Sequence, residues 1–201
     1  MKASLLLWGS VGGAGLLAGG WWAYQTYIPP TPRSPQSLLP LLARYPLTDP
    51  QGHPADISAL GGKVVLLNFV YTRCPSVCPR LQAQLRAVLQ ALPPSPCLVA
   101  VSISLDPERD TGSVWLAHQY SYAVPGHTWL FWRPASQKWA FALAKTVFGL
   151  SATALPQGEI LHADAILLLD NEGRLRGSYS STDSRLLRHV RQLLRLCDTV
   201  S

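Results

Sequence analysis

The strongest candidate for chemistry in this sequence is a cysteine pair, Cys74-Pro75-Ser76-Val77-Cys78, followed at once by Pro79. Thiolates bind soft metal ions and also exchange with disulfides, so these residue types allow either a metal site or a redox site. The pair follows an apolar run of strand length, Val64–Val70, and precedes leucines at helical spacing. A helix N-terminus lowers the pKa of a nearby thiol and favours the thiolate.

Pro79 leaves two local structures open. Either Cys74–Cys78 is one helical turn that kinks, or it is a loop and the helix begins at Pro79. In a helix, positions i and i+4 share a face within reach of one ion, and the same separation permits a disulfide. Geometry therefore does not decide between a metal site and a redox-active disulfide. Two inert buried cysteines are the third interpretation, which a strand–helix junction disfavours.

The elements around the pair alternate between strand and helix from about Tyr45 onward. Besides the first strand and helix, we expect strands at Leu98–Ser104, Thr128–Trp132, Ala165–Asp170 and Leu175–Ser180, and helices at Thr111–Tyr122, Ser136–Phe148 and Ser184–Cys197. Asn171-Glu172-Gly173 is typical of a hairpin turn between the last two strands. This order predicts an α/β, thioredoxin-like domain over residues 47–201, with a central mixed sheet flanked by helices.

The N-terminal part has a different composition. Leu5–Ile28 is an uncharged apolar run that follows Lys2 and has aromatic residues at its far end. It is long enough to cross a bilayer, so residues 1–28 are predicted to be a transmembrane helix, with a cleaved signal peptide as the alternative. Five prolines between Pro29 and Pro40 predict that residues 29–46 form an extended linker. We expect a single-pass anchor in a bacterial inner membrane, with the domain in the periplasm.

The composition excludes two broad classes. Hydrophobic residues make up 48% of the chain and charged residues only 14%, so intrinsic disorder is not its main state. The net charge is +6, but the basic residues are scattered, and nucleic acid is not an expected partner.

At this point the sequence resembles a known family. Phe69–Pro79 is similar to the signature of the Sco/SenC proteins, which are membrane-anchored copper chaperones for cytochrome c oxidase. Gly61–Phe69 resembles the first core strand of that family, Asp106–Thr111 its acidic loop and Phe148–Leu150 a short step before its metal histidine. His162 matches the position of that histidine, 84 residues after Cys78.

The resemblance implies a function. Cys74, Cys78 and His162 would bind copper as Cu(I) and Cu(II), and the chain would deliver it to the two-copper centre of cytochrome c oxidase. The partners would be the oxidase subunit that carries this centre, a periplasmic copper donor and the membrane, and the chain would not be an enzyme. Two alternatives stay open: a membrane-anchored thiol–disulfide oxidoreductase that acts on the oxidase cysteines, and a copper- or redox-sensing module.

Other residues have weaker claims to a role. Asp106 lies at the end of the second core strand and is a candidate polar neighbour of the metal or a simple turn residue before Pro107. Cys97 precedes the second core strand, just after the helix that follows the cysteine pair, and Cys197 ends the last helix. In a thioredoxin-like layout both helices cover the same sheet face and their C-terminal ends lie close together, so Cys97 and Cys197 are either a structural disulfide or two free thiols. His53 is predicted to be a surface residue, His118 and His189 to be solvated, and His127 to be at most an accessory ligand.

Overall fold

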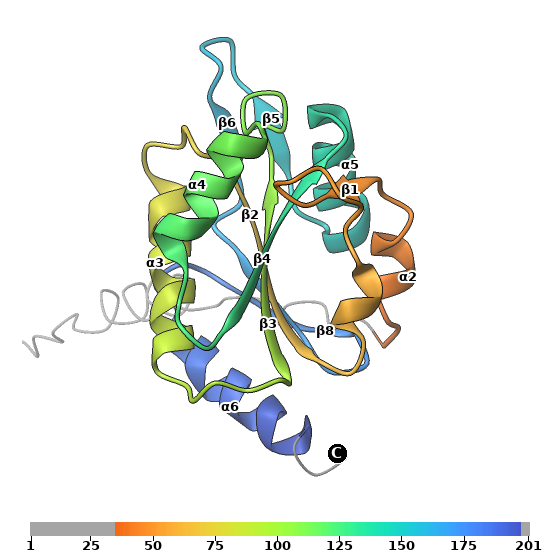
Figure 1. Cartoon of the computed structure of the whole chain (residues 1–201), viewed down its shortest axis with the longest axis vertical. Coiled ribbons are helices and arrows are strands. Elements are labelled where there is room, and N and C mark those ends of the chain that lie inside the picture. Colours follow the sequence, from red (N-terminus) through yellow and green to blue (C-terminus); the bar gives the residue numbers. More distant parts are fainter. Residues whose placement is uncertain (1–34, 198–201) are drawn as a thin grey trace, which may run out of the picture. The chain divides into compact units, whose positions relative to one another are not determined.

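The computed structural model describes residues 35–197, which form an α/β domain around one mixed sheet (Figure 1). The apolar run that is predicted to be a membrane anchor lies outside the described residues. Within residues 35–197, the helices are too short or too polar to span a bilayer. In chain order, the elements are α2 Leu39–Leu42, β1 Leu47–Thr48, η1 Ile57–Leu60, β2 Val64–Val70, α3 Val77–Gln90, β3 Leu98–Ser104, α4 Gly112–Tyr122, β4 Thr128–Pro134, α5 Gln137–Phe148, β5 Ala152–Ala154, β6 Ile160–His162, β7 Ile166–Leu169, β8 Leu175–Tyr179 and α6 Arg185–Cys197.

The main sheet has the strand order β1-β4-β3-β2-β7-β8. Its centre is parallel, because β2 pairs with β3 and β3 with β4 in the same direction, whereas β7 runs antiparallel to β2. All residues of β2 and β3 are buried, as expected for strands that are covered on both faces. The thioredoxin-like class with a mixed sheet, predicted from the sequence, is confirmed.

Helices cover both faces of this sheet. α3 and α4 lie on one side, and α2 and α5 lie on the other (Figure 1). α6 packs beside α3, since the Arg191 guanidinium donates a hydrogen bond to the Ala91 carbonyl oxygen at 3.2 Å. Because β2 and β3 are parallel, their carboxyl ends meet at one end of the domain, where α3 begins.

A separate two-stranded ribbon, β5–β6, stands at this same end (Figure 1). It pairs Ala152 with His162 and Ala154 with Ile160 in antiparallel register. These strands are three residues each and were not among the strands expected from the sequence. They matter because β6 carries His162.

Two boundaries differ from the prediction. α3 begins at Val77, so Cys78 lies in its first turn while Cys74 lies in the preceding loop. Part of the predicted linker also belongs to the packed domain, because α2 buries Leu42, and Leu38 before it is buried as well. Pro40 does not prevent this helix, since a proline in the first turn removes no hydrogen bond that the helix needs.

Candidate metal centre

Cys74 and Cys78 lie where β2 gives way to α3. Cys74 is 8% exposed and Cys78 is 2% exposed, and both are free thiols in the structure. The backbone N–H of Cys78 donates to Cys74 Sγ at 3.3 Å, and the backbone N–H of Tyr71 donates to Cys78 Sγ at 3.4 Å. Backbone donors thus hold each sulfur in place from within its own loop.

The two thiols differ sharply in acidity. A hydrogen bond from Cys78, together with the backbone N–H groups of Cys78 and Ser76, lowers the pKa of Cys74 to about 4. Burial raises the pKa of Cys78, and its hydrogen bond to Cys74 and the charge of that thiolate raise it further. In the metal-free protein, Cys74 is therefore the thiolate and Cys78 keeps its proton.

His162 reaches this pair from β6. Its Nε2 lies 3.3 Å from Cys78 Sγ. On the other side of the ring, Nδ1 lies 3.0 Å from the carbonyl oxygen of Ala163, which can only accept a hydrogen bond. Nδ1 must therefore carry the proton, and Nε2 presents its lone pair to the sulfurs, as in many metal-binding histidines.

One sulfur from each cysteine and one ring nitrogen from His162 lie within 4.8 Å of one another. Among residues 35–197, this is the group of histidine, cysteine and acidic side chains whose spacing could hold a metal ion. Two soft thiolates and one imidazole suit copper in both common oxidation states and also suit zinc. Because only three ligands converge, a fourth position stays open, unlike in a closed structural zinc site.

The group lies beside a shallow pocket of about 110 Å³ between the cysteine loop and the β5–β6 ribbon. Two leucines of this ribbon also line the pocket, Leu155 at 36% and Leu161 at 66% exposure. The site is thus open at one side and rimmed by apolar side chains.

The acidic loop after β3 supports the cysteine loop. Asp110 is fully buried and accepts hydrogen bonds from the Thr72 backbone N–H at 3.1 Å, from the Thr72 hydroxyl at 2.5 Å and from the Ser104 hydroxyl at 2.5 Å. These bonds tie the segment before Cys74 to the end of β3. Burial raises the pKa of Asp110 against the effect of these bonds.

Asp106 does not belong to the group of possible ligands. Its carboxylate is 1% exposed and faces the Arg109 and Arg73 guanidinium groups, at 3.3 and 3.7 Å. Its backbone carbonyl accepts from the N–H groups of Arg109 and Asp110, as in a turn. Asp106 therefore orders the loop and reaches the site only through Arg73, the neighbour of Cys74.

The remaining histidines lie elsewhere. His53 is exposed, as predicted, and pairs with Asp49. The prediction that His118 is solvated is wrong, because it stacks on Trp115 at 5.4 Å between ring centroids, and burial lowers its pKa. His127 lines a different pocket, beside α4 and β4.

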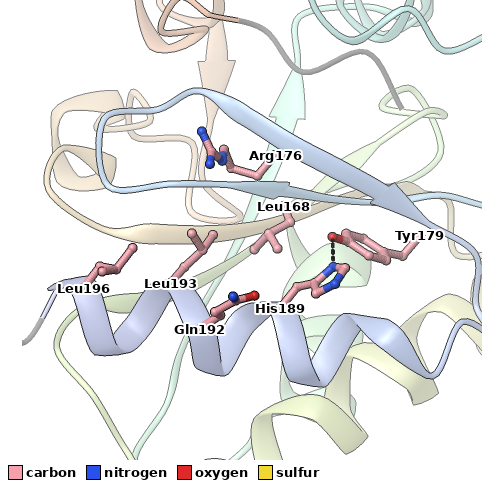
Figure 2. A pocket seen from close by; sticks show the side chains of 7 residues that line it. All are labelled: Leu168, Arg176, Tyr179, His189, Gln192, Leu193 and Leu196. Atoms are coloured by element: carbon pink, nitrogen blue, oxygen red, sulfur yellow. Dashed lines mark hydrogen bonds between the residues drawn. The ribbon is translucent and has the colours of Figure 1, made fainter. Parts of the chain in front are cut away.

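His189 is also less solvated than predicted. It lines a pocket of about 250 Å³ that the C-terminal helix α6 forms with β7 and β8. Figure 2 shows its Nδ1 facing the Tyr179 hydroxyl, which lies 2.6 Å away. None of the three predicted ligands lines this pocket.

Cys97 and Cys197 form a disulfide, with their Cα atoms 6.4 Å apart. Cys97 directly precedes β3, so the bond lies at the end of the sheet opposite Cys74 and Cys78. The predicted structural disulfide is therefore confirmed, and the alternative of two free thiols is wrong.

Sequence reasoning missed one residue of the site. Tyr71 contacts both cysteines through its backbone, and its ring meets the His162 ring edge-on at 5.9 Å between centroids. Its place directly after a buried strand, three residues before Cys74, is the sequence signal that could have identified it.

Comparison with known families and proteins agrees with this geometry. The profile of the SCO1/SenC family matches residues 34–195. A SCO1 protein homolog from Bacillus subtilis is 24% identical over 136 residues, which are 66% of this chain and 70% of that protein. The mitochondrial SCO2 homolog of Mus musculus is 30% identical over 148 residues, which are 70% of this chain but only 56% of that protein.

Solved structures give the same result. ScoI of Bradyrhizobium japonicum, determined with copper bound, matches with a TM-score of 0.61 and 27% identity over 75% of this chain and 96% of that one. BsSco, described as a member of the Sco family of cytochrome c oxidase assembly proteins, matches with a TM-score of 0.62 over 75% and 91%. Its identity of 22% supports the fold alone.

Proposed function

The chain belongs to the SCO1/SenC family, and we propose that it binds copper through Cys74, Cys78 and His162 and delivers it to the two-copper centre of cytochrome c oxidase. One observation carries the proposal: two sulfurs and an imidazole nitrogen, from segments 84 residues apart, converge within 4.8 Å. The copper-bound relative and the description of the family as oxidase assembly proteins support it.

Copper is the cargo in this proposal, so the site must release it as well as bind it. Thiolates favour Cu(I), and an imidazole makes the site acceptable to Cu(II). With three ligands and one open side, a ligand of the recipient can bind the ion before the donor ligands leave it. The apolar rim at Leu155 and Leu161 gives the recipient a surface to contact beside the ion.

A second candidate function is favoured by the unequal acidity of the cysteines. If the protein is a thiol–disulfide reductase, the Cys74 thiolate attacks a disulfide of the oxidase, forms a mixed disulfide and releases one thiol of the substrate. Cys78 would then attack Cys74 Sγ, release the second thiol and leave a Cys74–Cys78 disulfide, so that two electrons pass to the substrate. This reaction needs no ligand from His162.

We also propose that residues 1–28 export the chain and anchor it in a bacterial inner membrane, with the domain in the periplasm. The uncharged run Leu5–Ile28 behind Lys2 supports this. The oxidase subunit with the two-copper centre and a periplasmic copper donor would meet the domain there. The Cys97–Cys197 disulfide is consistent with an oxidising compartment.

The change from His162 to alanine separates the two functions. Because it removes one of three ligands, we expect copper affinity to fall by roughly 100-fold or more, beyond the loss usual for an outer-shell partner. The Cys74–Cys78 reduction potential should stay close to that of the wild type. Competitive titration with a copper chelator and equilibration in glutathione buffers measure the two quantities.

His53→Ala is the matched control, since its side chain is 74% exposed and lies in a turn outside the site. Cys74→Ala and Cys78→Ala should each abolish the intense thiolate-to-Cu(II) visible band. Full copper affinity in His162→Ala, with a defect only in disulfide exchange, would favour the reductase. An unchanged visible band in both cysteine variants would rule out the site.

A further inference from the structure

Tyr71 connects the two segments that carry the candidate ligands. It is 3% exposed and directly follows β2. Its carbonyl oxygen accepts from the Cys74 backbone N–H at 3.2 Å, and its own N–H donates to Cys78 Sγ at 3.4 Å. The backbone of Tyr71 is therefore fixed to the cysteine loop.

Its side chain is fixed to the histidine strand. The Tyr71 hydroxyl accepts a hydrogen bond from the Ile160 N–H at 3.1 Å and donates one to the Ile160 carbonyl oxygen at 3.4 Å. Both groups belong to one residue of β6, two positions before His162. The hydroxyl thus takes the place that a neighbouring strand would have beside Ile160.

The ribbon β5–β6 needs such a contact. It is not part of the main sheet, and an isolated two-stranded ribbon is marginally stable by itself. Ile160 is 5% exposed. In an antiparallel ribbon, hydrogen-bonded residue pairs alternate with pairs that are not hydrogen-bonded. The Leu155 N–H donates to the Glu159 carbonyl oxygen, so the next pair, Ala154 and Ile160, is not hydrogen-bonded, and the backbone N–H and C=O of Ile160 point away from β5. Without the hydroxyl, these buried groups would lose their partner.

We infer that the Tyr71 hydroxyl is a positioning group, which holds β6 so that His162 Nε2 faces the two sulfurs. This inference rests on the proposed copper site, and it assigns Tyr71 no role as a ligand. The Tyr71 hydroxyl also interacts with the Cys74 side chain. Both of its backbone hydrogen bonds are to Ile160, however, so we assign its effect on copper binding to His162. The Tyr71 backbone holds the cysteine loop independently of this side chain.

Tyr71→Phe tests the inference because it removes the hydroxyl and keeps the ring that packs against His162. We expect Cu(I) affinity to fall about 10-fold, the size expected for losing one or two buried hydrogen bonds. The Cu(II) visible and electron paramagnetic resonance spectra should change as the nitrogen ligand loosens, while the Cys74–Cys78 reduction potential stays constant. Thermal unfolding checks that the variant is folded.

Tyr45→Phe is the matched control. Its hydroxyl also donates to a backbone carbonyl at 3.4 Å, that of Ala142 in α5, and it lies outside the metal centre. This variant should bind copper with wild-type affinity and spectra. A loss equal to that of Tyr71→Phe would show a general effect of removing a tyrosine hydroxyl and would overturn the inference.

A double-mutant cycle decides whether the hydroxyl acts through His162. In a His162→Ala background, where two thiolates still bind Cu(I), Tyr71→Phe should cause no further loss of affinity. An equal loss in both backgrounds means that the hydroxyl acts on the cysteines, and no loss in either means that it positions nothing. Both results contradict the inference.

Nuclear magnetic resonance of the metal-free protein gives a readout that does not need copper. The His162 imidazole signals should shift or broaden in Tyr71→Phe, while those of His118 stay unchanged. If the wild-type protein fails to bind copper, the proposed function is wrong, yet these signals still test the positioning role. Unchanged His162 signals would refute that role even when copper binds.

Discussion

At the residue scale, Cys74 and Cys78 carry the same thiol in two different surroundings. Cys74 accepts hydrogen bonds and has a pKa near 4, whereas burial keeps Cys78 protonated. The difference suits both functions, because a thiolate is the form that binds metal and the form that attacks disulfides. The rates at which the two thiols are alkylated in the metal-free protein therefore test the hydrogen bonds and the burial that make them differ.

We predict that iodoacetamide modifies Cys74 and leaves Cys78 unmodified in the reduced, metal-free protein. A thiol whose pKa is lowered to about 4 is about 99% ionised at pH 6, so the rate should be flat between roughly pH 6 and pH 8. Below that range, the rate should fall as the thiolate gains its proton. Mass spectrometry of quenched samples gives the rate at each cysteine.

An ordinary thiol provides the contrasting behaviour. With a pKa near 8.5, its rate would rise about tenfold per pH unit over the same range. Such a slope at Cys74 would mean that the hydrogen bonds from Cys78 and Ser76 do not stabilise the thiolate in solution. Cys78→Ser tests the main cause, since a hydroxyl can still donate to Cys74 and should keep the rate nearly flat.

At the element scale, the site depends on loops that follow different strands. The loop after β2 carries the cysteines, and the loop after β3 carries Asp110, which binds Thr72 and Ser104. Parallel pairing of β2 and β3 brings both loops to one end of the sheet. Asp110 thereby connects two elements in the way that Tyr71 connects β2 to β6.

Asp110→Ala should lower the free energy of unfolding by about 2–4 kcal/mol, because it removes the acceptor of the buried Ser104 hydroxyl and of the partly buried Thr72 hydroxyl and backbone N–H. Asp110→Asn keeps an acceptor oxygen and should cost less. Urea denaturation measures both. Glu172→Ala is the control, since its pair with Arg174 is exposed at Glu172 and should be worth about 1 kcal/mol or less.

If Asp110→Ala has the same free energy of unfolding as Glu172→Ala, the hydrogen bonds by which Asp110 connects the two loops do not contribute to the stability of the domain.

The sequence predicted the long elements well and the short ones poorly. Val64–Val70 and Leu98–Ser104 have the bounds expected from their continuous apolar runs, because burial on both faces leaves a clear pattern. Ala152–Ala154 and Ile160–His162 are too short to show a period of two, so the ribbon that carries His162 was not expected. The helix at Leu39–Leu42 was not expected either, because it is only four residues long and contains Pro40.

The site was predicted unequally as well. The cysteine pair shows itself by spacing, whereas His162 became a candidate only through the family resemblance, since nothing local links it to residues 84 positions earlier. The hydroxyl bond of Tyr71 joins positions 89 apart and leaves no pattern in the sequence. Contacts of this kind depend on the closed fold and cannot be obtained from periodicity.

At the scale of the whole molecule, the domain has two ends with different cysteine chemistry. The metal centre lies at the carboxyl ends of β2 and β3, where its thiols must stay reduced to bind copper. The Cys97–Cys197 disulfide lies at the other end and closes a separation of 100 residues. Because they lie at opposite ends of the sheet, the Cys97–Cys197 disulfide and the free thiols Cys74 and Cys78 are kept apart.

This arrangement leads to a prediction that joins stability to location. Cys97→Ser with Cys197→Ser should lower the free energy of unfolding by about 2–4 kcal/mol, since a bond that closes a long loop restricts the unfolded chain, while copper affinity stays unchanged. Acid quenching and thiol trapping in bacterial cells should find this bond formed in the full chain. A chain that begins at Pro29 should stay in the cytoplasm, where these thiols remain reduced. Free Cys97 and Cys197 in the full chain, with the bond forming readily in the purified protein, would contradict the proposed export by residues 1–28.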